Sequence, residues 1–299
     1  MKFRELPNQW KKKIIVLSSI SVLFLILLVS FNVFLYGLRA ENAKQREKLV
    51  KKDSDLIGER IDIPREGKPA VKANLYLPDN WGDGRLPVVF NIHGGGFVGG
   101  DADALDTQSD RLAKEWNAVV VSINYTKADV KPIAYGSEEI RDAVLYFAKH
   151  AETYGVVPAK FTLMGYSAGA YYAADSTRLL QKEGFRMASL VLCYPLTTGL
   201  KVDKLAKDFP PALFVLAGKD PISQKAKSFV KAMESAGLDV EVLEYKNAVH
   251  SFIESNNPEG SMESTVDMSE VINPEQKSLA REAEAAIGQW VKRRASEVQ

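Results

Sequence analysis

Residues 14–38 form a run of 25 positions without a charged side chain or a histidine, rich in isoleucine, valine, leucine and phenylalanine. A helix rises about 1.5 Å per residue, so this run reaches roughly 37 Å and can cross a hydrocarbon core of about 30 Å. A buried core helix and a cleaved signal peptide are the alternatives. The apolar part of a signal peptide is shorter, about 7–15 residues, and residues 36–40 offer a poor cleavage site. We therefore expect a retained transmembrane anchor.

Basic residues flank this run on both sides, so their number does not decide which end is cytoplasmic. Lys11, Lys12 and Lys13 lie directly before it and favour a cytoplasmic N-terminus, because lysine and arginine concentrate on that side of membranes. We expect a single-pass protein of the cell membrane whose larger part lies outside the cytoplasm. The expected organisation is a basic N-terminal tail at 1–13, the transmembrane anchor at 14–38, a stalk at 39–55 and one globular domain at 56–299.

The net charge of +1 is a cancellation between two unlike parts of the chain. Residues 1–52 hold 11 basic and 3 acidic side chains, and the remaining residues hold 28 basic and 35 acidic ones. A domain with a net charge of −7 repels nucleic acid and anionic lipid headgroups, so no nucleic-acid partner is expected. The single cysteine, Cys193, excludes an internal disulfide and a cysteine-ligated metal cluster.

The pattern of the globular part predicts an α/β fold. Two short runs, 57–63 and 71–77, are separated by a Pro-Arg-Glu-Gly turn and predict a hairpin. Apolar runs of strand length then alternate with amphipathic segments of helical length, which is typical of a mostly parallel sheet covered by helices on both faces. The expected further strands are 86–92, 118–123, 161–164, 190–193, 212–217 and 240–243, and the expected helices are 110–116, 137–154, 168–180, 224–236 and 274–294.

Two glycine motifs directly follow predicted strands. Gly165-Tyr166-Ser167-Ala168-Gly169 has the G-x-S-x-G form of a tight strand-to-helix turn that exposes a serine hydroxyl, and its alternative reading is a glycine-rich surface turn. His93-Gly94-Gly95-Gly96-Phe97 leaves backbone N–H groups free to approach a substrate oxygen, as in an oxyanion hole completed by the N–H of Ala168. A phosphate-binding loop is less favoured, because no G-K-[ST] or G-x-G-x-x-G spacing is present.

A serine nucleophile needs a base, and the chain has three histidines. His93 belongs to the glycine loop, and His150 lies near the end of a charged helix, where we expect a solvated surface residue. His250 follows the last predicted strand and is the base by elimination, with a surface loop histidine as the alternative. Asp220 follows the predicted strand 212–217 and lies between Ser167 and His250 in the chain, as an orienting acid should.

Together these motifs resemble the α/β-hydrolase superfamily, and His93–Phe97 in particular resembles the hormone-sensitive-lipase-like esterases and related bacterial carboxylesterases. The resemblance implies an eight-stranded, mostly parallel sheet and a reaction that requires no metal or organic cofactor. It implies that Ser167 is the nucleophile, His250 the general base and then acid, and Asp220 the orienting residue. The implied oxyanion hole consists of the N–H groups of Gly95, Gly96 and Ala168, supported by His93, Gly94, Gly165 and Gly169.

The chain departs from the family pattern in two places. Thr126 stands where relatives commonly have arginine, and Tyr166 stands where they often have aspartate. Only about 15 residues separate Pro195 from Pro211, where many relatives insert a helical cap, so we expect a reduced or absent cap and an open pocket. Conversely, the polar segment 253–273 is long for a connection in a compact domain, and we hypothesise that it folds over the pocket mouth.

The expected function is serine-dependent hydrolysis of carboxylic esters, with short-chain acyl or acetyl esters on small molecules or glycans as substrates. A peptidase or amidase with the same triad is one alternative. A catalytically silent hydrolase-like binding module is the other.

Overall fold

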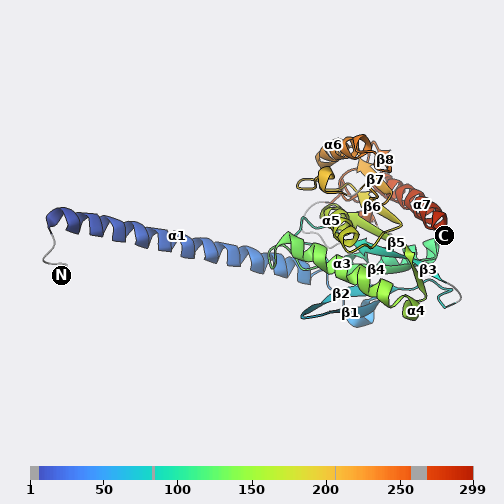
Figure 1. The fold of residues 1–299 in the computed structure, drawn as a ribbon, viewed down its shortest axis with the longest axis horizontal. Coiled ribbons are helices and arrows are strands. Elements are labelled where there is room, and N and C mark those ends of the chain that lie inside the picture. The colour runs from blue at the N-terminus through green and yellow to red at the C-terminus, as the bar shows by residue number, and fades with distance from the viewer. Residues whose placement is uncertain (1–6, 83–84, 206, 257–267, 299) are drawn as a thin grey trace. The chain divides into compact units, whose positions relative to one another are not determined.

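The computed structural model describes residues 7–82, 85–205, 207–256 and 268–298. The chain divides into two compact units, Met1–Gln45 and Arg46–Gln299. Helix α1 (Asn8–Glu47) makes up the described part of the first unit (Figure 1). Its segment Leu23–Glu47 is long and apolar enough to cross a membrane, with a mean hydropathy of 2.0 and no buried residue in the apolar window. A helix of this kind serves as a signal sequence or as a membrane anchor.

The second unit is built on one eight-stranded sheet with the order β1-β2-β4-β3-β5-β6-β7-β8. The hairpin of β1 and β2 is antiparallel, β2 also pairs antiparallel with β4, and all other neighbours are parallel. This confirms the prediction of a mostly parallel sheet led in by a hairpin. The strands are β1 (Glu59–Arg65), β2 (Lys68–Tyr76), β3 (Leu86–Ile92), β4 (Val119–Asn124), β5 (Val156–Tyr166), β6 (Ser189–Cys193), β7 (Ala212–Ala217) and β8 (Val240–Tyr245).

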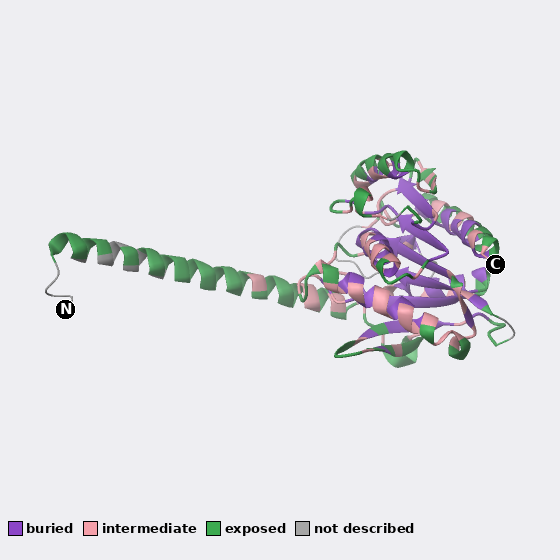
Figure 2. Cartoon of the chain, viewed as in Figure 1, coloured by how far each residue is buried: buried purple, intermediate pink, exposed green. Residues whose placement is uncertain are grey.

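Helices cover both faces of the sheet. Successive side chains of a strand point to opposite faces, so each central strand contributes to two separate apolar clusters, one beneath each helical layer. On β3, Val88, Phe90 and Ile92 pack in one cluster and Val89 packs in the other. Helices α3 (Ile133–Lys149), α5 (Ala168–Lys182) and α6 (Pro221–Ser235) contribute to the first cluster, and α2 (Asp106–Trp116) and α7 (Pro274–Glu297) contribute to the second. The central strands β3, β4, β6 and β7 are mostly buried between these layers, whereas the edge strands β1 and β8 are largely exposed or half-buried (Figure 2).

Two predicted elements differ from the structure. The helix expected at 137–154 is broken at His150, where α3 ends and the short α4 (Ala151–Tyr154) begins. His150 is partly buried there, with its Nδ1 2.8 Å from the carbonyl oxygen of Tyr146, so it is not the solvated residue that we expected. Strand β5 begins at Val156, earlier than predicted, because Leu86 pairs with it before a register shift that apolar periodicity does not reveal.

The segment expected as a stalk, 39–55, is shared between the two units. Helix α1 continues to Glu47, whereas residues from Arg46 onward belong to the second unit. We call residues 46–57 the strap. It is bound to the rest of the second unit by ion pairs of Arg46 with Asp129, at 2.9 Å, and of Lys51 with Asp106, at 2.7 Å.

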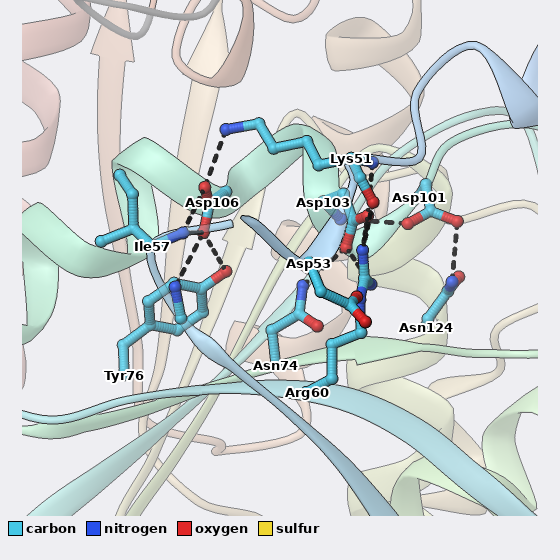
Figure 3. A network of polar contacts seen from close by, with 11 residues as sticks. Lys51, Asp53, Ile57, Arg60, Asn74, Tyr76, Asp101, Asp103, Asp106 and Asn124 are labelled. Atoms are coloured by element: carbon cyan, nitrogen blue, oxygen red, sulfur yellow. Dashed lines mark hydrogen bonds and ion pairs between the residues drawn. The ribbon is translucent and has the colours of Figure 1, made fainter. Parts of the chain in front are cut away.

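Two buried carboxylates, Asp103 and Asp106, hold the strap (Figure 3). Asp106 accepts hydrogen bonds from the backbone N–H groups of Ile57 and Gly58, each at 3.1 Å, and from the Tyr76 hydroxyl at 3.0 Å. Asp103 accepts from both terminal nitrogens of Arg60, at 2.9 and 2.8 Å, from Asn74 at 2.8 Å and from the backbone N–H of Lys51 at 2.8 Å. Burial acts to raise the pKa of Asp103, but the bonds from Arg60 and Asn74 outweigh it and lower that pKa. Both carboxylates are thus satisfied although they are buried.

Replacing Asp106 by alanine should destabilise the second unit by about 3 kcal/mol, because two backbone N–H groups and the Tyr76 hydroxyl lose their acceptor. The measurement is equilibrium urea unfolding of the full chain in detergent micelles, followed by tryptophan fluorescence. Asp62→Ala is the control, since Asp62 pairs with Lys72 on an exposed surface and its loss should change the free energy of unfolding by less than about 1 kcal/mol. Equal effects of the two substitutions would contradict the account of the strap.

Candidate active site

Ser167 lies at a sharp turn between β5 and α5, with φ 52° and ψ −115°. A serine in this left-handed region is strained, and the turn is held by close backbone packing on either side. A Cβ on Gly165 would lie 2.4 Å from the carbonyl oxygen of Gly169, and a Cβ on Gly169 would lie 2.3 Å from that of Ile92. Glycine is therefore required at both positions by lack of space, and the turn is fixed against the end of β3.

Ser167, His250 and Asp220 are joined by two hydrogen bonds. The Nε2 atom of His250 lies 2.9 Å from the Ser167 Oγ, and its Nδ1 lies 2.8 Å from the Asp220 Oδ2. The three residues follow β5, β8 and β7, and the carboxyl ends of these parallel strands meet at one edge of the sheet. The serine proton can pass to the imidazole, and the resulting cation would face a carboxylate.

Asp220 is fixed in place by its backbone surroundings as well as by His250. It is the N-cap of α6, where its side chain accepts from the N–H of Ile222 at 2.9 Å and from the Ser223 hydroxyl at 3.3 Å. Burial acts to raise the pKa of Asp220, but the hydrogen bonds from His250 and Ile222 outweigh it, so the pKa is lowered. Asp220 is therefore ionised at neutral pH.

The glycine loop after β3 lies next to Ser167. A Cβ on Gly94 would lie only 3.6 Å from the Ser167 Cβ. Gly95 and Gly96 adopt positive φ values of 120° and 59°, and the carbonyl oxygen of Gly95 accepts from the N–H of Gly99 at 2.7 Å. Ala168 is the first residue of α5, where backbone N–H groups have no acceptor within the helix. The structure thus brings the loop and the start of α5 to the serine.

His93 is buried beneath this loop and does not face the serine hydroxyl. Its Nδ1 is 2.6 Å from the carbonyl oxygen of Gly94, its Nε2 is 3.0 Å from the Nζ of Lys127, and its ring stacks on Tyr125 at 4.3 Å between centroids. Burial and the charge of Lys127 lower the pKa of His93. These contacts fit a neutral ring that donates through Nδ1 and accepts through Nε2.

Lys127 is a buried cation that no sequence motif indicated. Besides His93, its Nζ contacts the Asn124 Oδ1 at 2.7 Å and the carbonyl oxygen of Tyr125 at 2.8 Å. Burial lowers the pKa of Lys127 to about 8. The preceding Thr126, which departs from the family pattern, is bonded through its N–H and hydroxyl to Glu139 at 2.6 and 2.7 Å.

A cavity of about 360 Å³ opens beside His250 and the glycine loop. Apolar side chains form much of its wall, including Leu49 of the strap, and two carboxyl groups, Asp101 and Glu254, lie in it. The sequence analysis singled out neither Leu49 nor Glu254 individually. The remaining lining residues are Gly100, Ala104, Leu105, Ser251, Ser255, Met268 and Val271.

The connection expected to cover the pocket, 253–273, lies partly outside the described residues, which omit 257–267. Its described ends line the cavity, and they are tied together because the Asn256 side chain donates to the carbonyl oxygens of Phe252, at 2.8 Å, and Val271, at 2.6 Å. Between β6 and β7, the only helical element in the described residues is the short 3-10 turn η4 (Val202–Lys204). The described part of this connection therefore contains no helical cap.

The lowered pKa of Lys127 predicts a pH dependence of stability with a definite sign. An unfolded lysine titrates near pH 10.4, so between pH 8 and pH 10 the unfolded chain binds more protons than the folded protein. The contribution of Lys127 to the free energy of unfolding should therefore rise with pH through this window. In Lys127→Met this contribution is lost. The rise in the free energy of unfolding from pH 7.5 to pH 10 should therefore be smaller than in the unsubstituted chain by about 2 kcal/mol, as measured by urea unfolding at both pH values.

Lys149→Met is the matched control, because Lys149 is exposed at the end of α3. Its pH profile should follow that of the unsubstituted chain. A profile of Lys127→Met that also runs parallel to the unsubstituted chain would contradict the assignment of a low pKa.

Known proteins are similar to the part of the chain that contains both glycine motifs, Asp220 and His250. A family described as "alpha/beta hydrolase fold" matches residues 89–207 and 199–254. The esterase LipI of Mycobacterium tuberculosis is 26% identical over 238 residues, covering 64% of this chain and 74% of LipI. An acetyl esterase of Salmonella choleraesuis is 30% identical over 121 residues, covering 40% of this chain and 36% of that protein.

Solved structures show the same fold. The thermophilic carboxylesterase EstE1, from a metagenomic library, superposes with a TM-score of 0.68 at 23% identity, covering 89% of this chain and 98% of EstE1. The family match spans more than half of the chain and includes both glycine motifs, and it confirms the expected family resemblance. The chain belongs to the hormone-sensitive-lipase-like α/β-hydrolases, a family of carboxylic ester hydrolases.

Proposed function

We propose that this protein hydrolyses carboxylic esters through an acyl-enzyme formed on Ser167. The observation that carries the proposal is the hydrogen-bonded series from Ser167 Oγ through His250 to Asp220, at 2.9 and 2.8 Å. In this mechanism His250 removes the serine proton as Oγ attacks the ester carbonyl, and it then protonates the leaving alcohol oxygen. Asp220 orients the ring and stabilises the imidazolium. Water, activated by His250, releases the acid in the second half of the reaction.

The negative oxygen of the tetrahedral intermediate would be stabilised by the N–H groups of Gly95, Gly96 and Ala168. The support is their position: the loop approaches Ser167 at Gly94, and Ala168 begins α5. Fixed N–H groups are effective for this purpose because they need no reorganisation as charge develops. A second favourable feature is the strained φ of Ser167 at a turn whose hydroxyl lies within hydrogen-bond distance of His250.

We infer that the substrates are short-chain acyl or acetyl esters of small molecules or glycans. A cavity of about 360 Å³ is at the small end for ligand sites, which favours small acyl and alcohol groups. The short connection between β6 and β7 supports a reduced cap and access for esters attached to larger molecules. The similarity to an acetyl esterase supports the acetyl group among the candidates.

The proposed location is the cell membrane, with α1 as a retained anchor at 14–38 and the second unit outside the cytoplasm. Support comes from the hydropathy of α1 and from the basic residues before the apolar run.

Ser167→Ala should abolish covalent labelling by a fluorophosphonate probe and hydrolysis of para-nitrophenyl acetate, because both require the Oγ nucleophile. His150→Ala should keep both activities, since His150 contacts Tyr146 at the junction of α3 and α4. Labelling that persists without Ser167 would falsify the nucleophile assignment. A protein that cleaves peptide substrates as fast as esters would instead be a peptidase, and a wild type that resists the probe would be a silent binding module.

The anchor makes a separate prediction for the protein expressed in bacterial cells. It should stay in the membrane pellet after an alkaline carbonate wash, and mass spectrometry of the purified chain should recover peptides from residues 39–52 joined to the apolar segment. Protease added to spheroplasts should digest the second unit. A mature chain that begins after the apolar run would refute the anchor, and protection from protease would reverse the orientation.

A further inference from the structure

Glu254 places its carboxyl group in the cavity beside His250, and the proposed mechanism does not use this group. It lies four residues after His250, in the short turn η5 (Glu254–Asn256), and it lines the same cavity. Its Oε2 accepts a short hydrogen bond from the hydroxyl of Tyr194, a residue that directly follows β6. This bond orients the carboxyl group, so Glu254 has a defined position in the cavity wall.

The other oxygen of Glu254 lies close to the reacting serine. A Cβ on Gly94 would lie 3.4 Å from the Glu254 Oε1 and 3.6 Å from the Ser167 Cβ, so both side chains approach the side of this glycine to which a Cβ would point. The ring of Tyr194 also packs edge-on against the ring of His250, at 5.2 Å between centroids. Glu254 thus approaches the same glycine as the proposed nucleophile, Ser167, and it contacts Tyr194, whose ring packs against the proposed base, His250.

The charge state of Glu254 fits a role in recognition. Burial raises the pKa of Glu254 to about 8, so the group is mostly uncharged at neutral pH. A carboxylate at this position would oppose the negative oxygen of the tetrahedral intermediate, whereas a neutral carboxyl group does not. The other ionisable groups that line the cavity are Asp101, His93 and His250. With Oε2 accepting from Tyr194, a neutral carboxyl group can still form a hydrogen bond with a substrate hydroxyl through Oε1.

We infer that the leaving alcohol lies on the side of the cavity that Glu254 occupies. His250 must reach the leaving oxygen to protonate it, so the alcohol part of the ester lies next to His250. The loop that carries His250 also supplies Ser251, Glu254 and Ser255 to the cavity wall. The cavity wall also contains the apolar residues Leu49, Leu105 and Val271, which offer no hydrogen bond through their side chains.

We propose that Glu254 is a specificity-determining residue that hydrogen-bonds a hydroxyl group on the alcohol part of the ester. This rests on the proposed function, and it narrows the substrate class to monoesters of diols, polyols or sugars. An alkyl ester of equal size would leave the Glu254 oxygen without a partner in the bound state. Discrimination by a lost buried hydrogen bond of this kind is about tenfold.

The test compares 2-hydroxyethyl acetate with propyl acetate, which have the same number of heavy atoms and differ in one hydroxyl group. The wild-type full chain should show a KM about tenfold lower for the hydroxyethyl ester, with similar kcat values. In Glu254→Met this preference should vanish through a rise in KM for the hydroxyethyl ester alone. Glu254→Gln keeps an acceptor oxygen in the same place and should retain most of the preference. Acetylcholine carries a quaternary ammonium group, which cannot donate a hydrogen bond, so its KM should not depend on Glu254.

Glu282→Met is the matched control, because Glu282 is exposed on α7 and the same change there should leave both esters unaffected. Equal losses for both esters in Glu254→Met would overturn the proposal in favour of a purely structural role. A wild type that does not prefer the hydroxyethyl ester would overturn it without any variant, even if Glu254→Met fails to fold. A wild type that hydrolyses neither ester and resists the fluorophosphonate probe would overturn the proposed function itself.

Discussion

The close contact between α5 and the end of β3 is the constraint on which the catalytic region depends. Gly169 lies so near the carbonyl oxygens of Ile92 and His93 that a single added carbon would stand 2.3 and 2.4 Å from them. This contact joins the turn at Ser167 to the glycine loop that begins at His93. Because both segments continue from adjacent parallel strands, the serine and the loop amides have fixed relative positions before any substrate arrives.

Buried charge is the second recurring theme, and each case is compensated locally. Asp103 and Asp106 bind the strap through backbone N–H groups and cations, so the segment that follows α1 becomes part of the cavity wall at Leu49. Lys127 lies beneath the glycine loop and contacts the ring of His93. Glu254 avoids the cost of burial in another way, since its raised pKa keeps it mostly neutral.

The division of charge along the chain follows the same physical logic. Basic residues flank the apolar run of α1 on both sides, and such an apolar helix is typical of a signal sequence or a membrane anchor. The second unit carries an excess of carboxylates, and several of them form ion pairs within it. The near-neutral total hides two parts with different surroundings.

The sequence by itself determined the sheet type, most strands, the apolar helix, and the order in which Ser167, Asp220 and His250 follow β5, β7 and β8. Those features depend on periodicity and on local turn chemistry, which are readable from neighbouring residues. Only the tertiary structure decided that Leu49 enters the cavity, that His93 pairs with Lys127, and that Glu254 faces Gly94. It also decided the break at His150, which local helical periodicity does not mark. These contacts join segments far apart in the chain, and no local pattern encodes the direction in which a side chain meets a distant partner.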